Sequence, residues 1–269
     1  MLLALKHAQV PAFLAALTVA GRVWGPSVAG WLAGLPVVAG PIVLLLALER
    51  GPVFAAQASA ASIAAIAASE AFNFAYAWTC RRSAWQLALT TGMLGWVGVA
   101  MLLTHLPGGL MWAVAAGCVA VAISQNGLPR VMGHVPTAHL GLGDLAVRML
   151  AGALLTVAVT TLSASMGATW SGLLSVFPLL GIVLAVSAQR AHGADFVALL
   201  MRGMVIGRGS FAAFFAVTAM MLPHYGVWLG FACASVVSVA VQGATRRMLG
   251  TRRPVQALTR ELAEQQSAD

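Results

Sequence analysis

The sequence predicts an all-α protein, a polytopic membrane helix bundle with about nine transmembrane helices in two inverted-topology repeats. Three observations predict this fold class. Of the 269 residues, 60% are hydrophobic and only 8% are charged, against roughly 25% charged residues in an ordinary soluble domain. The apolar residues gather in runs of bilayer-spanning length, and the two halves of the chain resemble each other. Composition therefore excludes a soluble globular enzyme, a disordered chain and a secreted disulfide scaffold.

Nine apolar runs approach the ~20 residues that a spanning helix needs. The run 5–21 is the weakest because Lys6 and Pro11 interrupt it, and a cleaved signal peptide is the alternative interpretation. The expected spans are 5–21, 27–48, 52–79, 84–104, 107–124, 143–165, 168–188, 194–221 and 225–245. The long polar loop divides the chain into a first repeat over 1–124, a cytoplasmic connecting loop over 125–142, a second repeat over 143–249 and a cytoplasmic tail over 250–269.

The basic residues predict an orientation in the membrane. The net charge is +8, but the arginines stand singly or in pairs between apolar runs, so we expect no nucleic-acid partner. Alternating the loops from an outside N-terminus places eleven Lys and Arg residues on one side and two on the other. Cytoplasmic loops carry the excess of Lys and Arg. We therefore expect the N-terminus outside and the C-terminus in the cytoplasm.

An internal similarity relates the two halves. A shift of 142 residues places 27–77 on 169–219 without a gap, with nine identical positions. The most specific part is the pattern G-x5-P-x14-G-x2-F, carried by Gly30/Gly172, Pro36/Pro178, Gly51/Gly193 and Phe54/Phe196. The copies lie five predicted spans apart, so they cross the bilayer in opposite directions. Inverted repeats of this kind are typical of many secondary transporters.

Two stretches within these copies carry a family resemblance. They are WLAGLPVVAGPIVLLLALERG over 31–51 and WSGLLSVFPLLGIVLAVSAQRAHG over 170–193, and each precedes a long helix. Each resembles the core of the GlpM-like family of small bacterial inner-membrane proteins, which carry one such unit, so this chain is similar to two fused units. The resemblance implies a bacterial cell inner membrane. It implies no activity and no site residue.

Prolines interrupt one predicted span in each half. Pro36 and Pro41 lie in 27–48, and Pro178 lies in 168–188. A proline inside a helix removes one backbone hydrogen bond and kinks it. Paired interrupted helices point to the substrate site of a transporter, so these prolines are candidate substrate-binding positions. The alternative is a pair of kinked packing helices whose freed backbone groups are satisfied by neighbours.

Three charges lie inside two spans that are rich in small residues and therefore expected to be central. At 1.5 Å per residue, Glu70 and Arg202 lie about 7 and 8 Å to the cytoplasmic side of the midplane, and Arg208 lies at the midplane. Equal depth predicts an ion pair between Glu70 and Arg202. Arg208 is then left to meet an anionic group. Two alternatives stay open: all three charges are structural, or different span limits move them to the surface.

The remaining chemistry-bearing residues form no recognisable site. The cysteines Cys80, Cys118 and Cys233 show no metal-ligand spacing and are expected to be small buried hydrophobes. The histidines fall in loops or at span ends, and His134 with His139 is a weak metal pattern. Asp144 is expected to cap the helix that begins near it. No hydrolase, zinc, phosphate-loop or dinucleotide motif occurs, so we expect no catalytic residue, no metal and no cofactor.

These observations favour a secondary transporter of a small anionic or zwitterionic solute, with alternating access at a midplane site between the repeats. Arg208 and Arg202 are the expected substrate-binding cations, and Glu70 is the expected proton-coupling acid. The alternative is a non-transporting scaffold subunit of an envelope or lipid-modifying machine, whose basic tail over 246–260 docks a partner or anionic lipid. A membrane-embedded enzyme is a third reading. The expected partners are membrane lipids and a small-molecule substrate, and a homodimer is left open.

Overall fold

The computed structural model describes residues 2–105, 109–131 and 142–249, and every regular element within these ranges is an α-helix. This confirms the all-α class. The expected loop over 125–142 is described except for 132–141; its first three residues belong to α6, and Leu142 begins α7. The expected tail over 250–269 lies outside the described residues. The helices are α1 (Leu2–Trp24), α2 (Pro26–Ala33), α3 (Ala39–Arg50), α4 (Pro52–Thr79), α5 (Trp85–Thr104), α6 (Leu110–Gly127), α7 (Leu142–Ser165), α8 (Ala168–Ser175), α9 (Leu179–His192) and α10 (Ala194–Leu249).

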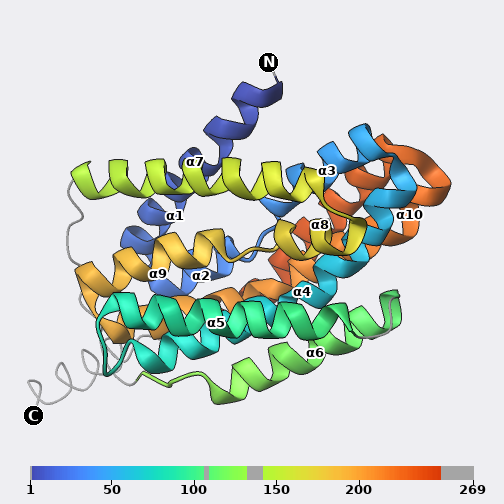
Figure 1. The fold of residues 1–269 in the computed structure, drawn as a ribbon. Coiled ribbons are helices and arrows are strands. Elements are labelled where there is room, and N and C mark those ends of the chain that lie inside the picture. Colours follow the sequence, from blue (N-terminus) through green and yellow to red (C-terminus); the bar gives the residue numbers. More distant parts are fainter. Residues whose placement is uncertain (1, 106–108, 132–141, 250–269) are drawn as a thin grey trace, which may run out of the picture.

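Two of the expected spans are each divided into two short helices. The first is broken between α2 and α3, and the second between α8 and α9, where Figure 1 shows a non-helical link. Pro36 and Pro178 lie at these breaks, where a proline offers no N–H to continue the preceding helix. Pro41 instead lies in the first turn of α3, where backbone N–H groups have no intrahelical partner and proline costs little.

The expected last two spans correspond to two helical arms within α10, which turns back on itself at a kink. Gly226 interrupts it with non-helical backbone angles, φ 76° and ψ 177°. Positive φ favours glycine, because a side chain there would clash with the backbone. The two arms of α10 lie side by side, since Ser210 Oγ hydrogen-bonds to Gln242 Oε1.

The helix α4 occupies the centre of the bundle and packs against α5, α6, α8 and α10. Alanine and serine dominate its sequence, and small side chains let neighbouring backbones approach closely. The first arm of α10 packs against α2 in the same way. A Cβ on Gly34 would lie only 2.5 Å from the Cα of Gly207. In Figure 1, α9 lies between α7 on one side and α5 on the other.

Five helical segments in the described residues are long and apolar enough to cross a membrane. They are Pro52–Thr79, Trp85–Thr104, Leu110–Gly127, Ala168–His192 and Ala194–Arg246. Shorter apolar helices cover Ala12–Trp24 and Ala146–Val159. Large apolar side chains on α5 and α6 are exposed, including Leu94, Met111 and Ile123, which suits a surface that faces lipid. The chain therefore has the features of a multi-pass membrane protein, and the count of nine spans stays a prediction.

Candidate functional site

A buried ion pair joins the two central helices. The Nε of Arg208 on α10 donates to Oε1 of Glu70 on α4 at 2.8 Å, with the two side chains 12% and 2% exposed. Asn73, one turn along α4, donates its Nδ2 to the same oxygen at 3.4 Å. Phe211 lies one turn beyond Arg208, and its ring centroid is 5.7 Å from the guanidinium carbon. The acid is thus held by two donors, and the guanidinium lies over an aromatic ring.

The second oxygen of this carboxylate is in a different situation. Glu70 Oε2 is buried, and no described residue offers it a hydrogen bond. An ionised carboxylate has about four acceptor sites, and a buried acceptor without a partner costs about 1–3 kcal/mol or more when charged. Oε2 is therefore the carboxylate oxygen that the described residues leave unsatisfied in this site.

A cavity of about 50 Å³ lies between the two helix breaks and reaches the ion pair. Its polar walls are the side chains of Ser69, Asn73, Ser175 and Arg208. The remaining walls come largely from the breaks themselves and from the starts of α3 and α9, including Leu35, Val38, Ala39, Phe177, Pro178 and Leu179. A space of this size holds water molecules. The cavity brings together interrupted backbone from both halves of the chain and one intramembrane cation.

Serine side chains fasten α4 to the second break. Ser69 Oγ donates to the carbonyl oxygen of Val176 at 2.9 Å, which satisfies a backbone group that the broken helix leaves without a helical partner. Ser62, two turns earlier on α4, donates to the carbonyl oxygen of Gly172 at 3.2 Å and lies 2.8 Å from Ser175 Oγ. The position of the α8–α9 break is therefore fixed by α4.

A larger hollow of about 610 Å³ lies beside α4, α6 and α8, near the start of α4. Gln57, Ala61 and Ala64 line it from α4, and Trp112 and Thr169 line it from the starts of α6 and α8. Ser62 also lies on this stretch of α4, and its bonds to α8 join the two helices. The large hollow and the small cavity thus both border the junction of α4 and α8.

The structure corrects the expected ion pair. Glu70 pairs with Arg208 rather than with Arg202. The Nη1 of Arg202 instead donates at 3.0 Å to the carbonyl oxygen of Leu128, the residue that follows α6. Arg202 lines a separate hollow together with Gln125, Asn126, Leu128 and Arg130. The expectation that Arg208 stands alone at the midplane is therefore wrong.

The predicted site residues are brought together only in part. Arg208 and Pro178 line the cavity at the breaks, and Glu70 contacts it through Arg208 and Asn73. Pro36 lies in the first break between the lining residues Leu35 and Val38, but neither Pro36 nor Pro41 lines the cavity. The side chain of Asp144, which is expected to cap a helix, is not among those described, and neither are the loop residues His134 and His139.

Sequence reasoning missed the polar stripe along α4. It consists of Ser59, Ser62, Ser69, Asn73 and Tyr76, all of them buried. The spacings of three, seven, four and three residues place them on one face of a helix. This periodicity was visible in the sequence, but the abundance of alanine made the helix look uniform on every face. The stripe is the face on which α4 meets α8, α9 and α10.

Within the described part of the chain, no group of three or more His, Cys, Asp and Glu side chains is placed to hold a metal ion. No known protein family, no curated protein and no solved structure matched the chain when each was searched. The resemblance to the GlpM-like family therefore stays a prediction. The site has to be interpreted from its own geometry.

Proposed function

We propose that this chain is a secondary transporter that carries a small anionic or zwitterionic solute together with a proton. The observation that carries the proposal is the polar cavity between two broken helices, with Arg208 in its wall and Glu70 bonded to Arg208. Broken helices that meet near the midplane are the usual setting of a transporter's substrate site. The proposed halves are 1–124 and 143–249, related as inverted repeats.

Helix limits support the proposed repeats. The helices α2 and α8 both have 8 residues, and their first residues, Pro26 and Ala168, are 142 positions apart. Gly51 and Gly193, also 142 positions apart, both adopt positive φ, 92° and 81°, before the next long helix begins. The offset is the one at which the two sequences align. Local backbone geometry and sequence thus favour the same correspondence.

A pair of exchanged contacts supports a two-fold relation between the proposed halves. A Cβ on Gly30 of α2 would collide with the carbonyl oxygen of Leu200 on α10, and a Cβ on Gly172 of α8 would collide with that of Ala58 on α4. Gly30 and Gly172 are 142 positions apart, and so are Ala58 and Leu200. Each half therefore places its short helix against the long helix of the other. Reciprocal contacts of this kind are expected around a two-fold axis.

The charges suggest how a proton and an anion are coupled. The intact pair of Glu70 and Arg208 carries no net charge. A proton on Glu70 Oε2 neutralises the carboxylate and leaves the guanidinium charged and nearly buried, which is unfavourable inside a membrane. An anionic group entering the cavity restores neutrality at Arg208. Proton and anion therefore bind together, and the site stays neutral both empty and loaded.

The helix breaks add favourable dipoles for an anion. The starts of α3 and α9 both border the cavity, through Ala39 and Leu179. The first backbone N–H groups of a helix have no intrahelical partner, and a helix N-terminus carries a partial positive charge. Planar guanidinium geometry would add paired hydrogen bonds to a carboxylate or phosphate.

We place the protein in a bacterial inner membrane with the N-terminus outside. Arg22, Arg148 and Arg190 lie at the end of the bundle that we propose to be cytoplasmic. The turn after α4 lies at the same end, because Gln189 on α9 donates a hydrogen bond to the carbonyl oxygen of Ser83 in that turn. Clustering of basic side chains at one end follows the positive-inside rule.

Uptake into proteoliposomes tests the proposal. Radiolabelled succinate, glutamate and inorganic phosphate are offered with an inside-alkaline pH gradient. We expect at least one solute to accumulate, Arg208→Met to abolish its uptake, and Arg208→Lys to weaken it because an ammonium lacks the planar fork. Glu70→Gln should remove the response to the pH gradient. Arg50→Met, which removes an exposed arginine at the end of α3, is the control and should transport normally.

The scaffold reading makes the opposite prediction. A chain that moves none of these solutes, and in which the pair of Glu70 and Arg208 only supports folding, would favour a structural role for the site. Loss of stability in Arg208→Met is expected under both readings, so the absence of any flux is the result that favours the scaffold.

A further inference from the structure

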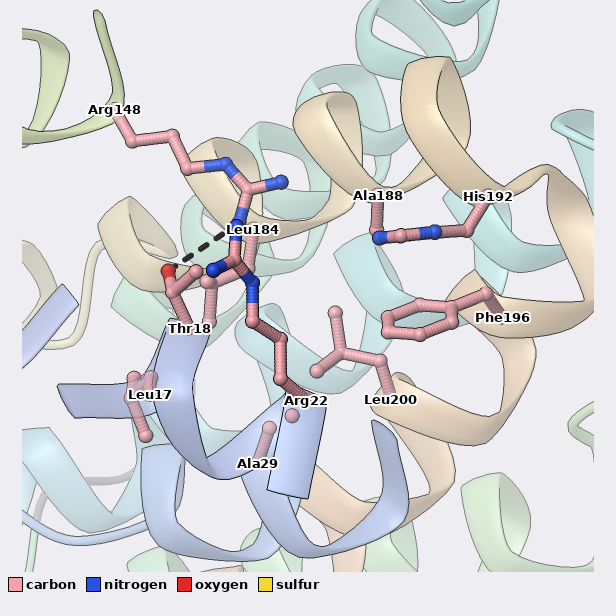
Figure 2. Close-up of a pocket in the computed structure, with 11 residues that line it drawn as sticks. Leu17, Thr18, Arg22, Ala29, Arg148, Leu184, Ala188, His192, Phe196 and Leu200 are labelled. Atoms are coloured by element: carbon pink, nitrogen blue, oxygen red, sulfur yellow. Dashed lines mark hydrogen bonds between the residues drawn. The ribbon is translucent and has the colours of Figure 1, made fainter. Parts of the chain in front are cut away.

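A second group of charged side chains lies away from the pair of Glu70 and Arg208. Arg22, Arg148 and His192 line a hollow of about 30 Å³ between α1, α7, α9 and α10. Figure 2 shows the guanidinium groups of Arg22 and Arg148 close together, with the His192 ring lying on Phe196. Arg148 is only 6% exposed, and its Nη1 donates to Thr18 Oγ1 at 3.4 Å. Nitrogen-bearing side chains from three helices thus line one hollow, with Arg148 buried, His192 partly buried and Arg22 exposed.

This cationic hollow adjoins a groove between α5, α7 and α9. The groove has a volume of about 350 Å³, within the usual range for ligand sites. Arg148 lines both spaces. Apolar side chains make up most of the groove wall, among them Leu89, Leu155 and Val186. Arg190 and Trp85 line it as well, so one space combines a long apolar wall with two arginines.

The ends of the surrounding helices place this site at a membrane–water interface. Arg22 lies in the last turn of α1, Arg190 and His192 lie in the last turn of α9, and Trp85 is the first residue of α5. Arginine and tryptophan at the ends of membrane helices are typical of the headgroup region. No acidic side chain is among the residues that line the hollow or the groove.

We infer that the groove holds one anionic phospholipid, with its phosphate at the exposed Arg190, the buried charge of Arg148 in the wall beside it, and an acyl chain along the apolar wall of α7 and α9. Basic pockets between transmembrane helices recognise anionic headgroups, and guanidinium groups bind phosphate by paired hydrogen bonds. A water-soluble anion would leave the apolar wall unused, and a zwitterionic lipid would gain less from several converging cations. The site is separate from the proposed transport cavity and does not depend on it.

Native mass spectrometry of the delipidated protein in a neutral detergent tests this inference. We expect phosphatidylglycerol to bind at one site and phosphatidylcholine with the same chains to bind far more weakly. Each arginine near an anionic headgroup contributes roughly 1 kcal/mol, so Arg148→Met with Arg190→Met should weaken phosphatidylglycerol binding about thirtyfold. Arg81→Met with Arg82→Met removes two exposed arginines, neither of which lines the hollow or the groove, and is the matched control. That variant should retain affinity within about threefold.

A second variant keeps the test decisive if loss of the buried Arg148 prevents folding. Arg190 is exposed, so Arg190→Glu should fold, and reversal of its charge should weaken phosphatidylglycerol binding by a similar factor. Equal binding of the two lipids, or equal losses in the control, would overturn the inference. Inorganic phosphate that binds as tightly as the lipid would also overturn it, because the site would then recognise a free anion.

Discussion

The partner of Glu70 can be identified by a double-mutant cycle. Glu70→Gln and Arg208→Met remove the charges singly and together with small changes in volume. At an effective dielectric constant of about 20, unit charges 2.8 Å apart attract by about 6 kcal/mol, and desolvation offsets part of this. We therefore expect Glu70→Gln to lower the free energy of unfolding by about 3–5 kcal/mol, the usual cost of breaking a buried pair.

The two single variants should differ in a defined direction. Arg208→Met leaves a buried carboxylate that can take up a proton and become neutral, whereas Glu70→Gln leaves a guanidinium that stays charged. Glu70→Gln should therefore be the more destabilising. The double variant should recover most of the loss, since no uncompensated charge is left. Reversible unfolding in bicelles by titration with sodium dodecyl sulfate measures each free energy.

Arg202→Met provides the matched control on the same helix. Its hydrogen bond goes to Leu128 rather than to Glu70, so its cost should add to that of Glu70→Gln within about 0.5 kcal/mol. Additive costs for Glu70 and Arg208, or strong coupling between Glu70 and Arg202, would refute the arrangement described here. The first result would make the 2.8 Å contact energetically unimportant, and the second would restore the pairing expected from depth alone.

Three further outcomes can be measured separately. Gly30→Ala should lower stability by about 1–3 kcal/mol, because its Cβ would collide with the backbone of α10. Position 98 on α5 faces open space, so Gly98→Ala should leave the stability unchanged or raise it. Thermal unfolding measures both variants. Burial raises the pKa of the Cys80 thiol to about 11, and only the thiolate reacts. Maleimide labelling near pH 8 should therefore be about a hundredfold slower than that of a free cysteine and should rise only toward pH 11; rapid labelling would contradict this burial. In a background that lacks all three native cysteines, a thiol reagent added on the periplasmic side should label Arg50→Cys and should not label Arg82→Cys. The reverse pattern would invert the proposed orientation.

Span limits could be predicted from the sequence where local signals are strong. The span expected over 52–79 coincides with α4, because Gly51 and Pro52 mark its start: proline suits the first helical position and glycine the turn before it. The sequence predicts where the helices are disturbed, near Pro36 and Pro178, but it does not predict that each helix breaks completely. A proline indicates where a helix is disturbed, whereas the neighbouring helix decides between a kink and a full break.

The wrong ion pair has a simple geometric cause. The rise per residue gives the depth of a side chain in the membrane and says nothing about its direction around the helix axis. Arg202 and Arg208 are six residues apart, so at about 100° per residue their side chains point about 120° apart. Only one of them can face α4. The contact of Arg202 with residues after α6 depends on tertiary packing, and no local sequence signal predicts it.

The exchanged contacts of α2 and α8 bear on how the protein is inserted during synthesis. A helix of 8 residues is only about 12 Å long and cannot cross a hydrocarbon core of about 30 Å by itself. The backbone of α2 packs against α10, which leaves the ribosome more than 150 residues later. Until then, α2 has its contacts with α1 but not those with α10. The final packing of the first half therefore forms only after α10 has been translated.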